Sequence, residues 1–84
     1  MKTTINSLIK LATISNNENR IELYKAMAQK LKNATKQEQN HLLEHFYSNL
    51  CGLMAHSEME SNEYNKLNIL LKHLQNICQA SQQS

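Results

Sequence analysis

Residues 35–54 of this sequence are TKQEQNHLLEHFYSNLCGLM, a stretch with the features of a capped amphipathic helix. In Thr35-Lys-Gln-Glu38, the threonine hydroxyl can accept a hydrogen bond from the third N–H, while the glutamate reaches back to the threonine N–H. The apolar residues that follow fall within about 120° of a helical wheel. They are Leu43, Phe46, Tyr47, Leu50, Leu53 and Met54. This pattern predicts a helix with one buried face.

The same S/T-x-x-E pattern occurs twice more, at Ser15–Glu18 and at Ser57–Glu60. Three such patterns divide the chain into four segments, and each segment places its apolar residues on one helical face. We therefore predict helices over residues 4–14, 16–33, 36–55 and 58–79. Residues 80–84 form a polar Gln/Ser tail that is expected to fray.

Composition supports an all-α fold. The 84 residues include no Pro, Val, Trp or Asp and one Gly, whereas Leu, Ile, Met and Ala fill 28 positions. This mixture favours helices and disfavours sheets. We predict one helical domain over residues 1–79, built as an antiparallel up-down bundle because the connections are short. An alternative is a hairpin of residues 36–55 and 58–79 that pairs with a second copy of the chain.

Charge is distributed unevenly along the chain. Residues 1–36 carry a net charge of +5 and residues 37–84 a net charge of −3, which leaves +2 overall. The two cysteines, Cys51 and Cys78, lack the spacing of a disulfide framework or a CxxC motif, so we expect reduced thiols and a cytoplasmic location. No apolar run approaches the roughly 18–20 residues of a membrane span.

The segment His41-Leu-Leu-Glu44-His45 has the H-x-x-E-H spacing of certain zinc peptidases. A catalytic zinc site needs a third ligand and a substrate cleft, which a chain of this length has little room to build. His41, His45 and His56 instead share a stripe opposite Leu50, which we interpret as a pH-sensitive surface. No Gly-rich phosphate loop or activated nucleophile is evident, so we predict no catalytic residue, cofactor or metal, and no enzyme.

Small residues lie beside this histidine stripe. Ser48, Gly52 and Ala55 recur at about one-turn spacing, which lets a second helix approach closely. Ile69 lies off the apolar face of its helix, among asparagines and a lysine. Because a thin core gains from further burial, we predict a homodimer with these four residues as candidate interface positions.

A basic stripe on the second predicted helix offers another function. Lys25, Lys32 and Lys36, with Arg20 nearby, could contact phosphates. The residue spacing over 28–35 is similar to that of the first helix and turn of a helix-turn-helix. In that arrangement Glu38 would point into the core. No aromatic residue interleaves with the lysines to stack a base. Nucleic-acid binding is therefore the alternative hypothesis.

Residues 50–53, Leu-Cys-Gly-Leu, and 64–71, Tyr-Asn-Lys-Leu-Asn-Ile-Leu-Leu, resemble small enterobacterial stress and biofilm regulators that act as two-component connectors. The resemblance covers about a quarter of the chain and rests on helical-hairpin residues, so it carries no family assignment. From the residues themselves, we predict a regulator, inhibitor or adaptor that binds another protein and catalyses nothing.

Overall fold

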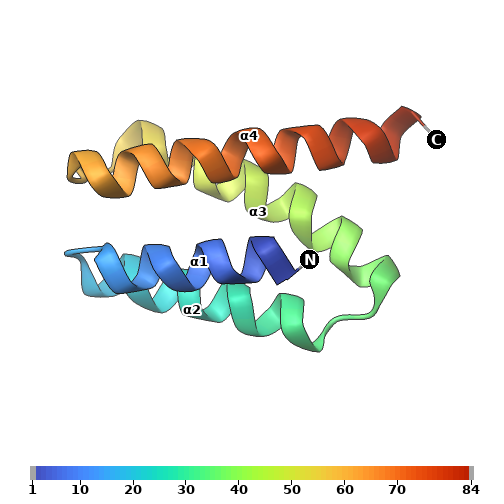
Figure 1. Ribbon diagram of the computed structural model, residues 1–84, viewed down its shortest axis with the longest axis horizontal. Helices are drawn as coiled ribbons and strands as arrows, with labels where there is room; N and C mark the ends of the chain where they lie inside the picture. The colour runs from blue at the N-terminus through green and yellow to red at the C-terminus, as the bar shows by residue number, and fades with distance from the viewer. Residues whose placement is uncertain (1, 84) are drawn as a thin grey trace.

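The computed structural model describes the backbone of residues 2–83 and the side chains of residues 2–77. Four helices follow one another: α1 (Lys2–Ile14), α2 (Glu18–Asn33), α3 (Lys36–His56) and α4 (Ser61–Gln83). They run alternately in opposite directions, and no residue between 2 and 83 belongs to a strand (Figure 1). This confirms the predicted all-α bundle of four helices.

The helices differ in how closely they pack. α1 packs closely against α2 and also contacts α4, and α3 packs mainly against α4. α2 and α3 meet only loosely, because α3 turns away from α2 after the connecting turn (Figure 1). The backbones of α2 and α4 do not approach each other, so these two helices lie on a diagonal of the bundle. All four helices of one chain thus form an up-down bundle.

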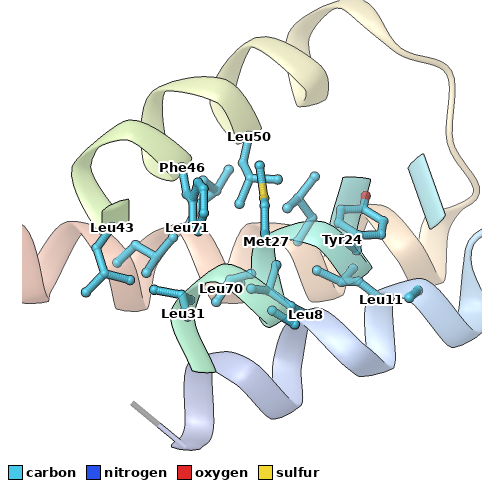
Figure 2. Close-up of a cluster of buried hydrophobic side chains, with 14 residues drawn as sticks. Leu8, Leu11, Tyr24, Met27, Leu31, Leu43, Phe46, Leu50, Leu70 and Leu71 are labelled. Atoms are coloured by element: carbon cyan, nitrogen blue, oxygen red, sulfur yellow. The ribbon is translucent and has the colours of Figure 1, made fainter. Parts of the chain in front are cut away.

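A leucine-rich core joins the four helices. Figure 2 shows side chains from α1, α2, α3 and α4 converging on the centre of the bundle. The core hydrophobic residues with the least exposure are Leu8, Leu11, Tyr24, Met27, Leu31, Leu43, Leu50, Leu67, Leu70 and Leu74. Burying each leucine contributes about 1.5–3 kcal/mol. Tyr64 is 45% exposed because it lies at the edge of the apolar arc in the first turn of α4.

Of the three predicted capping boxes, the box at Thr35 is formed. The Glu38 N–H donates to Thr35 Oγ1 at 3.2 Å, and the Thr35 N–H donates to Glu38 Oε1 at 3.3 Å. The prediction for Ser15 was wrong, since Asn17 caps α2 by accepting a hydrogen bond from the Arg20 N–H at 3.1 Å. Ser15 Oγ instead accepts from the Asn17 N–H within the turn.

The prediction that Ser57 begins the last helix was also wrong. Ser57 is the C-cap of α3, and its N–H donates to the Leu53 carbonyl oxygen at 2.9 Å. Residues 57–60 form the turn, so α4 begins at Ser61 rather than at residue 58. α4 then continues through residues 80–83, where the sequence favoured a frayed tail; residue 84 lies outside the described residues.

Candidate functional site

A buried polar network joins α2 to α4 at the end of the bundle that holds the α1–α2 and α3–α4 turns. Arg20 Nε donates to Glu63 Oε2 at 2.8 Å, and Arg20 Nη2 donates to Glu63 Oε1 at 3.2 Å. The Tyr24 hydroxyl donates to Glu63 Oε2 at 2.7 Å. Such a bidentate contact between a guanidinium and a carboxylate is strong and directional. The network therefore connects two helices whose backbones do not meet.

Arg20 and Glu63 occupy equivalent positions in their two helices. Arg20 is the third residue of α2 and Glu63 the third residue of α4, and both helices begin at the same end of the bundle. Helix N-termini favour a nearby carboxylate because their N–H groups carry partial positive charge. Arg20 Nη2 also donates to Asn16 Oδ1 at 3.0 Å, and Asn16 Nδ2 donates to Glu60 Oε1 at 3.4 Å. These hydrogen bonds connect the α1–α2 turn to the α3–α4 turn.

The protonation states of the network follow from burial and hydrogen bonding. Burial alone would raise the pKa of Glu63, but hydrogen bonds from Arg20, Tyr24 and Ser15 outweigh it and hold the pKa below its usual value. Burial and the hydrogen bond to Glu63 raise the pKa of Tyr24 well above that of a free phenol. The hydrogen bond to Glu63 raises the pKa of Arg20.

All three pKa values thus move away from neutrality. The hydrogen bonds of Arg20 and Tyr24 to the Glu63 carboxylate hold α2 and α4 together.

The structure corrects one sequence-based expectation about this network. Arg20 was grouped with the lysines as a nucleic-acid contact, but its side chain is buried and paired with Glu63. The Tyr24 hydroxyl is also buried and donates to the same carboxylate. One signal was present in the sequence: Arg20 and Glu63 fall on the apolar arcs of their helices and have opposite charges.

A second candidate site is the surface centred on α1, which lies between α2 and α4 (Figure 1). Between α1 and α4, a small groove is lined by Ser7, Lys10, Lys66 and Ile69. Between α1 and α2, another is lined by Ile5, Ile9, Lys25, Ala28, Gln29 and Lys32. Ile69 is 67% exposed and Ile9 is 49% exposed. We define the α1 face by Ile9, Lys10, Lys25, Lys32, Lys66 and Ile69.

The predicted basic stripe is only partly contained in the α1 face. Lys25 and Lys32 line one groove together with Gln29. Lys36 is exposed, but it begins α3 beyond the connecting turn and does not line that groove. The stripe therefore consists of two lysines in a groove and a third on another helix.

The third candidate site is the outer side of α3. His41, His45 and His56 are exposed there, together with Ser48 and Ala55, as predicted from the helical wheel. A Cβ atom added to Gly52 would meet no other atom within 4 Å, so this side of the helix is open. We define the α3 outer face by these six residues. Within the side chains described, no three metal-ligating residues gather in one place.

The four candidate interface residues do not form one surface. Ser48, Gly52 and Ala55 lie on the α3 outer face, whereas Ile69 lies in the groove between α4 and α1. The backbones of α1 and α3 do not approach each other. Cys51, on α3, is a half-buried free thiol, and the side chain of Cys78 lies outside the described residues.

No protein-family model matches this chain, and no curated protein or solved structure shows significant similarity to it. These comparisons give no support to the resemblance of residues 50–53 and 64–71 to enterobacterial regulators. Across residues 2–83, no helix combines the length and the apolar character that a membrane crossing requires.

Proposed function

We propose that this protein is a small cytoplasmic regulator, inhibitor or adaptor that acts by binding the surface of another protein, without catalysis. The observation that carries the proposal is the α1 face, where two isoleucines remain exposed although the core is complete. Protein interfaces depend on a few apolar anchors with a polar surround. Ile9 and Ile69, each beside two lysines in its groove, match that arrangement.

The buried network supports a non-catalytic function. Its charged groups satisfy one another inside the bundle, and their pKa values are displaced from neutrality. A regulator that acts by occlusion needs a stable scaffold more than a reactive group, and the network contributes to such a scaffold.

Affinity capture from the native host, followed by calorimetry with the purified partner, tests the proposal. We expect one dominant protein partner that binds the folded chain with defined stoichiometry. Ile69→Asn removes an exposed apolar side chain of the α1 face and should weaken binding of the partner. Tyr64→Asn removes an exposed ring outside the α1 face and is its matched control. The proposal is wrong if no specific partner is found, or if the chain hydrolyses a substrate in a metal-dependent reaction that is lost in His45→Ala.

We also propose that the chain forms a homodimer through the α3 outer face. The exposed Ser48 and Ala55 and the open space at Gly52 would let a second α3 approach closely, and two-fold pairing is the commonest arrangement.

Sedimentation equilibrium tests this dimer. We expect a dimer for the wild type and a monomer for Gly52→Leu, because the added side chain holds the helices apart. Ile69→Glu is the control, since Ile69 lies on a different surface. A monomeric wild type at tens of micromolar, or loss of the dimer in Ile69→Glu alone, contradicts the proposed interface.

Nucleic-acid binding is the second candidate function, and one observation favours it. Lys25, Gln29 and Lys32 line the same groove, so their polar groups could follow a phosphate backbone. Affinity for duplex DNA should then fall with salt, with a log–log slope of about −0.9 for each phosphate contact. The Lys25→Gln/Lys32→Gln variant should reduce that slope by about two contacts. A salt dependence unchanged by this variant would rule out the groove as the contact surface.

A further inference from the structure

We propose that the α1 face binds an acidic amphipathic helix of a partner protein, which places an aliphatic side chain beside Ile69 and carboxylates beside the flanking lysines. This inference rests on the proposed protein-binding function and adds the chemistry of the partner. It also chooses among the surfaces, because it assigns the partner to the α1 face and leaves the α3 outer face for self-association.

Charge is the first observation that points to an acidic partner. The two grooves of the α1 face are lined by four lysines and by no carboxylate. α1 contains no acidic residue, and the single one in α4, Glu63, is buried against Arg20. Among the described side chains the one ion pair is that of Arg20 with Glu63, so these lysines have no carboxylate within salt-bridge distance. Complementary charge on a partner would fix its orientation and speed its association.

The arrangement of anchors and lysines indicates a helical partner. On α4, Lys66 precedes the exposed Ile69 by nearly one turn, and both line the same groove as Lys10. On α2, Lys25 and Lys32 are two turns apart, or about 10 Å along the axis. A helix with carboxylates about two turns apart and aliphatic residues between them would match this spacing. Its apolar side chains would lie against Ile69 in the groove between α1 and α4.

Other occupants fit the α1 face less well. A nucleic acid could use the lysines, but it would place sugar and phosphate groups against two exposed isoleucines, and the grooves contain no aromatic side chain for base stacking. Membrane binding requires a broad apolar face that enters the bilayer interface. Here the apolar residues are few, and each lies beside lysines in a groove between helices.

Fluorescence anisotropy with a synthetic peptide tests the inference. The probe is a labelled helical peptide of Glu, Ala and Leu, about 18 residues long, with its leucines on one face. A scrambled peptide of the same composition is the first control. We expect the amphipathic peptide to bind at least about tenfold more tightly than the scrambled one. Lys10→Gln/Lys66→Gln and Ile69→Asn should each weaken its binding by about tenfold or more.

A matched charge variant is the second control. Lys30→Gln/Lys36→Gln removes the same charge from exposed positions that do not line the two grooves of the α1 face, and should change affinity by less than about threefold. Circular dichroism melts of all variants should match the wild type, because every substituted residue is exposed. Equal binding of the scrambled peptide, or equal loss with Lys30→Gln/Lys36→Gln, would mean non-specific charge attraction and would overturn the inference.

The same variants separate this inference from the proposed function. The assignment of the partner is wrong if the acidic peptide does not bind, whereas duplex DNA or phosphatidylglycerol vesicles bind and lose affinity with Lys10→Gln/Lys66→Gln and Ile69→Asn. If the purified natural partner binds but ignores Lys10→Gln/Lys66→Gln and Ile69→Asn, the inference fails and the proposed function stands. If no protein partner exists, the proposed function itself fails.

Discussion

Arg20, Lys25 and Lys32 all lie on α2, but Arg20 is buried and the two lysines are exposed. The Arg20 side chain is buried and its guanidinium is held by Glu63 in two hydrogen bonds. Lys25 and Lys32 are exposed and line a groove without a carboxylate. A buried charge must be compensated inside the chain, whereas an exposed one is solvated at little cost. The charge of Arg20 near the start of α2 therefore stabilises the fold, whereas the charges of Lys25 and Lys32 further along the helix are exposed to solvent.

Removing the partner of Arg20 tests this contrast most severely. Glu63→Ala leaves a buried guanidinium and the Tyr24 hydroxyl without their acceptor. We expect a loss of about 3–5 kcal/mol in the free energy of unfolding. Urea denaturation followed by circular dichroism measures it.

Glu60→Ala is the matched control for Glu63→Ala. Glu60 is exposed in the turn before α4 and accepts one long hydrogen bond from Asn16. Its loss should change stability by less than about 0.5 kcal/mol. If Glu63→Ala unfolds the chain, Glu63→Gln retains an acceptor oxygen and permits the measurement. A loss below about 1 kcal/mol for Glu63→Ala would show that the pair does not stabilise the fold.

Acid provides a smaller perturbation of the same network, since protonation removes the charge of Glu63 and keeps its oxygens. The pKa of Glu63 is lower in the folded chain than its ordinary value of about 4.5. The contribution is therefore fully present above about pH 4.5 and is lost as the pH falls through the folded-state pKa. Urea denaturation at a series of acidic pH values should show this loss in the wild type. Glu63→Gln should lack this part of the pH dependence, and an identical profile in both proteins would contradict the assignment.

Tyr24→Phe removes one hydrogen bond and leaves the ion pair intact. The Tyr24 hydroxyl donates to Glu63 Oε2 at 2.7 Å in a site without solvent exposure. A hydrogen bond to a charged group contributes about 1.5–3 kcal/mol, so the expected loss is of this size. The variant should also lose stability at a higher pH on acidification, because Glu63 loses a donor that lowers its pKa. An unchanged urea midpoint would contradict this role for Tyr24.

The lysines should show the smallest effect on stability. Lys25→Gln/Lys32→Gln alters exposed side chains that have no ion pair among the described residues. We expect the free energy of unfolding to stay within about 0.5 kcal/mol of the wild type. A larger loss would mean that these lysines belong to the fold, as Arg20 does, and are not free for a partner.

Helical periodicity was sufficient to predict the four helices and most of the core, because each apolar face is a local property of the chain. Caps were less predictable, since several residues compete for the same role. Asn17 lies two residues after Ser15 and caps α2, and Ser57 ends α3 rather than beginning α4. At Thr35 no competing residue intervenes before α3, and the capping box forms.

The candidate sites could be predicted only in part. Exposure of Ile69 and of the histidines on α3 follows from their wheel positions and was found from the sequence. The pairing of Arg20 with Glu63 was not, because the two residues are 43 positions apart and local periodicity does not identify a distant partner. The α1 face was missed for the same reason: its grooves depend on which helices flank α1.

The loose contact between α2 and α3 has a consequence for the order of events in folding. We expect α1 to pair with α2, and α3 with α4, early in folding, because contacts close in sequence have a low entropic cost. Joining the two hairpins would then remove water from Arg20 and Glu63 at a late step. Stopped-flow kinetics should therefore show that Glu63→Gln accelerates unfolding far more than it slows folding. The ion pair would thus set how long the native bundle persists, rather than how quickly it forms.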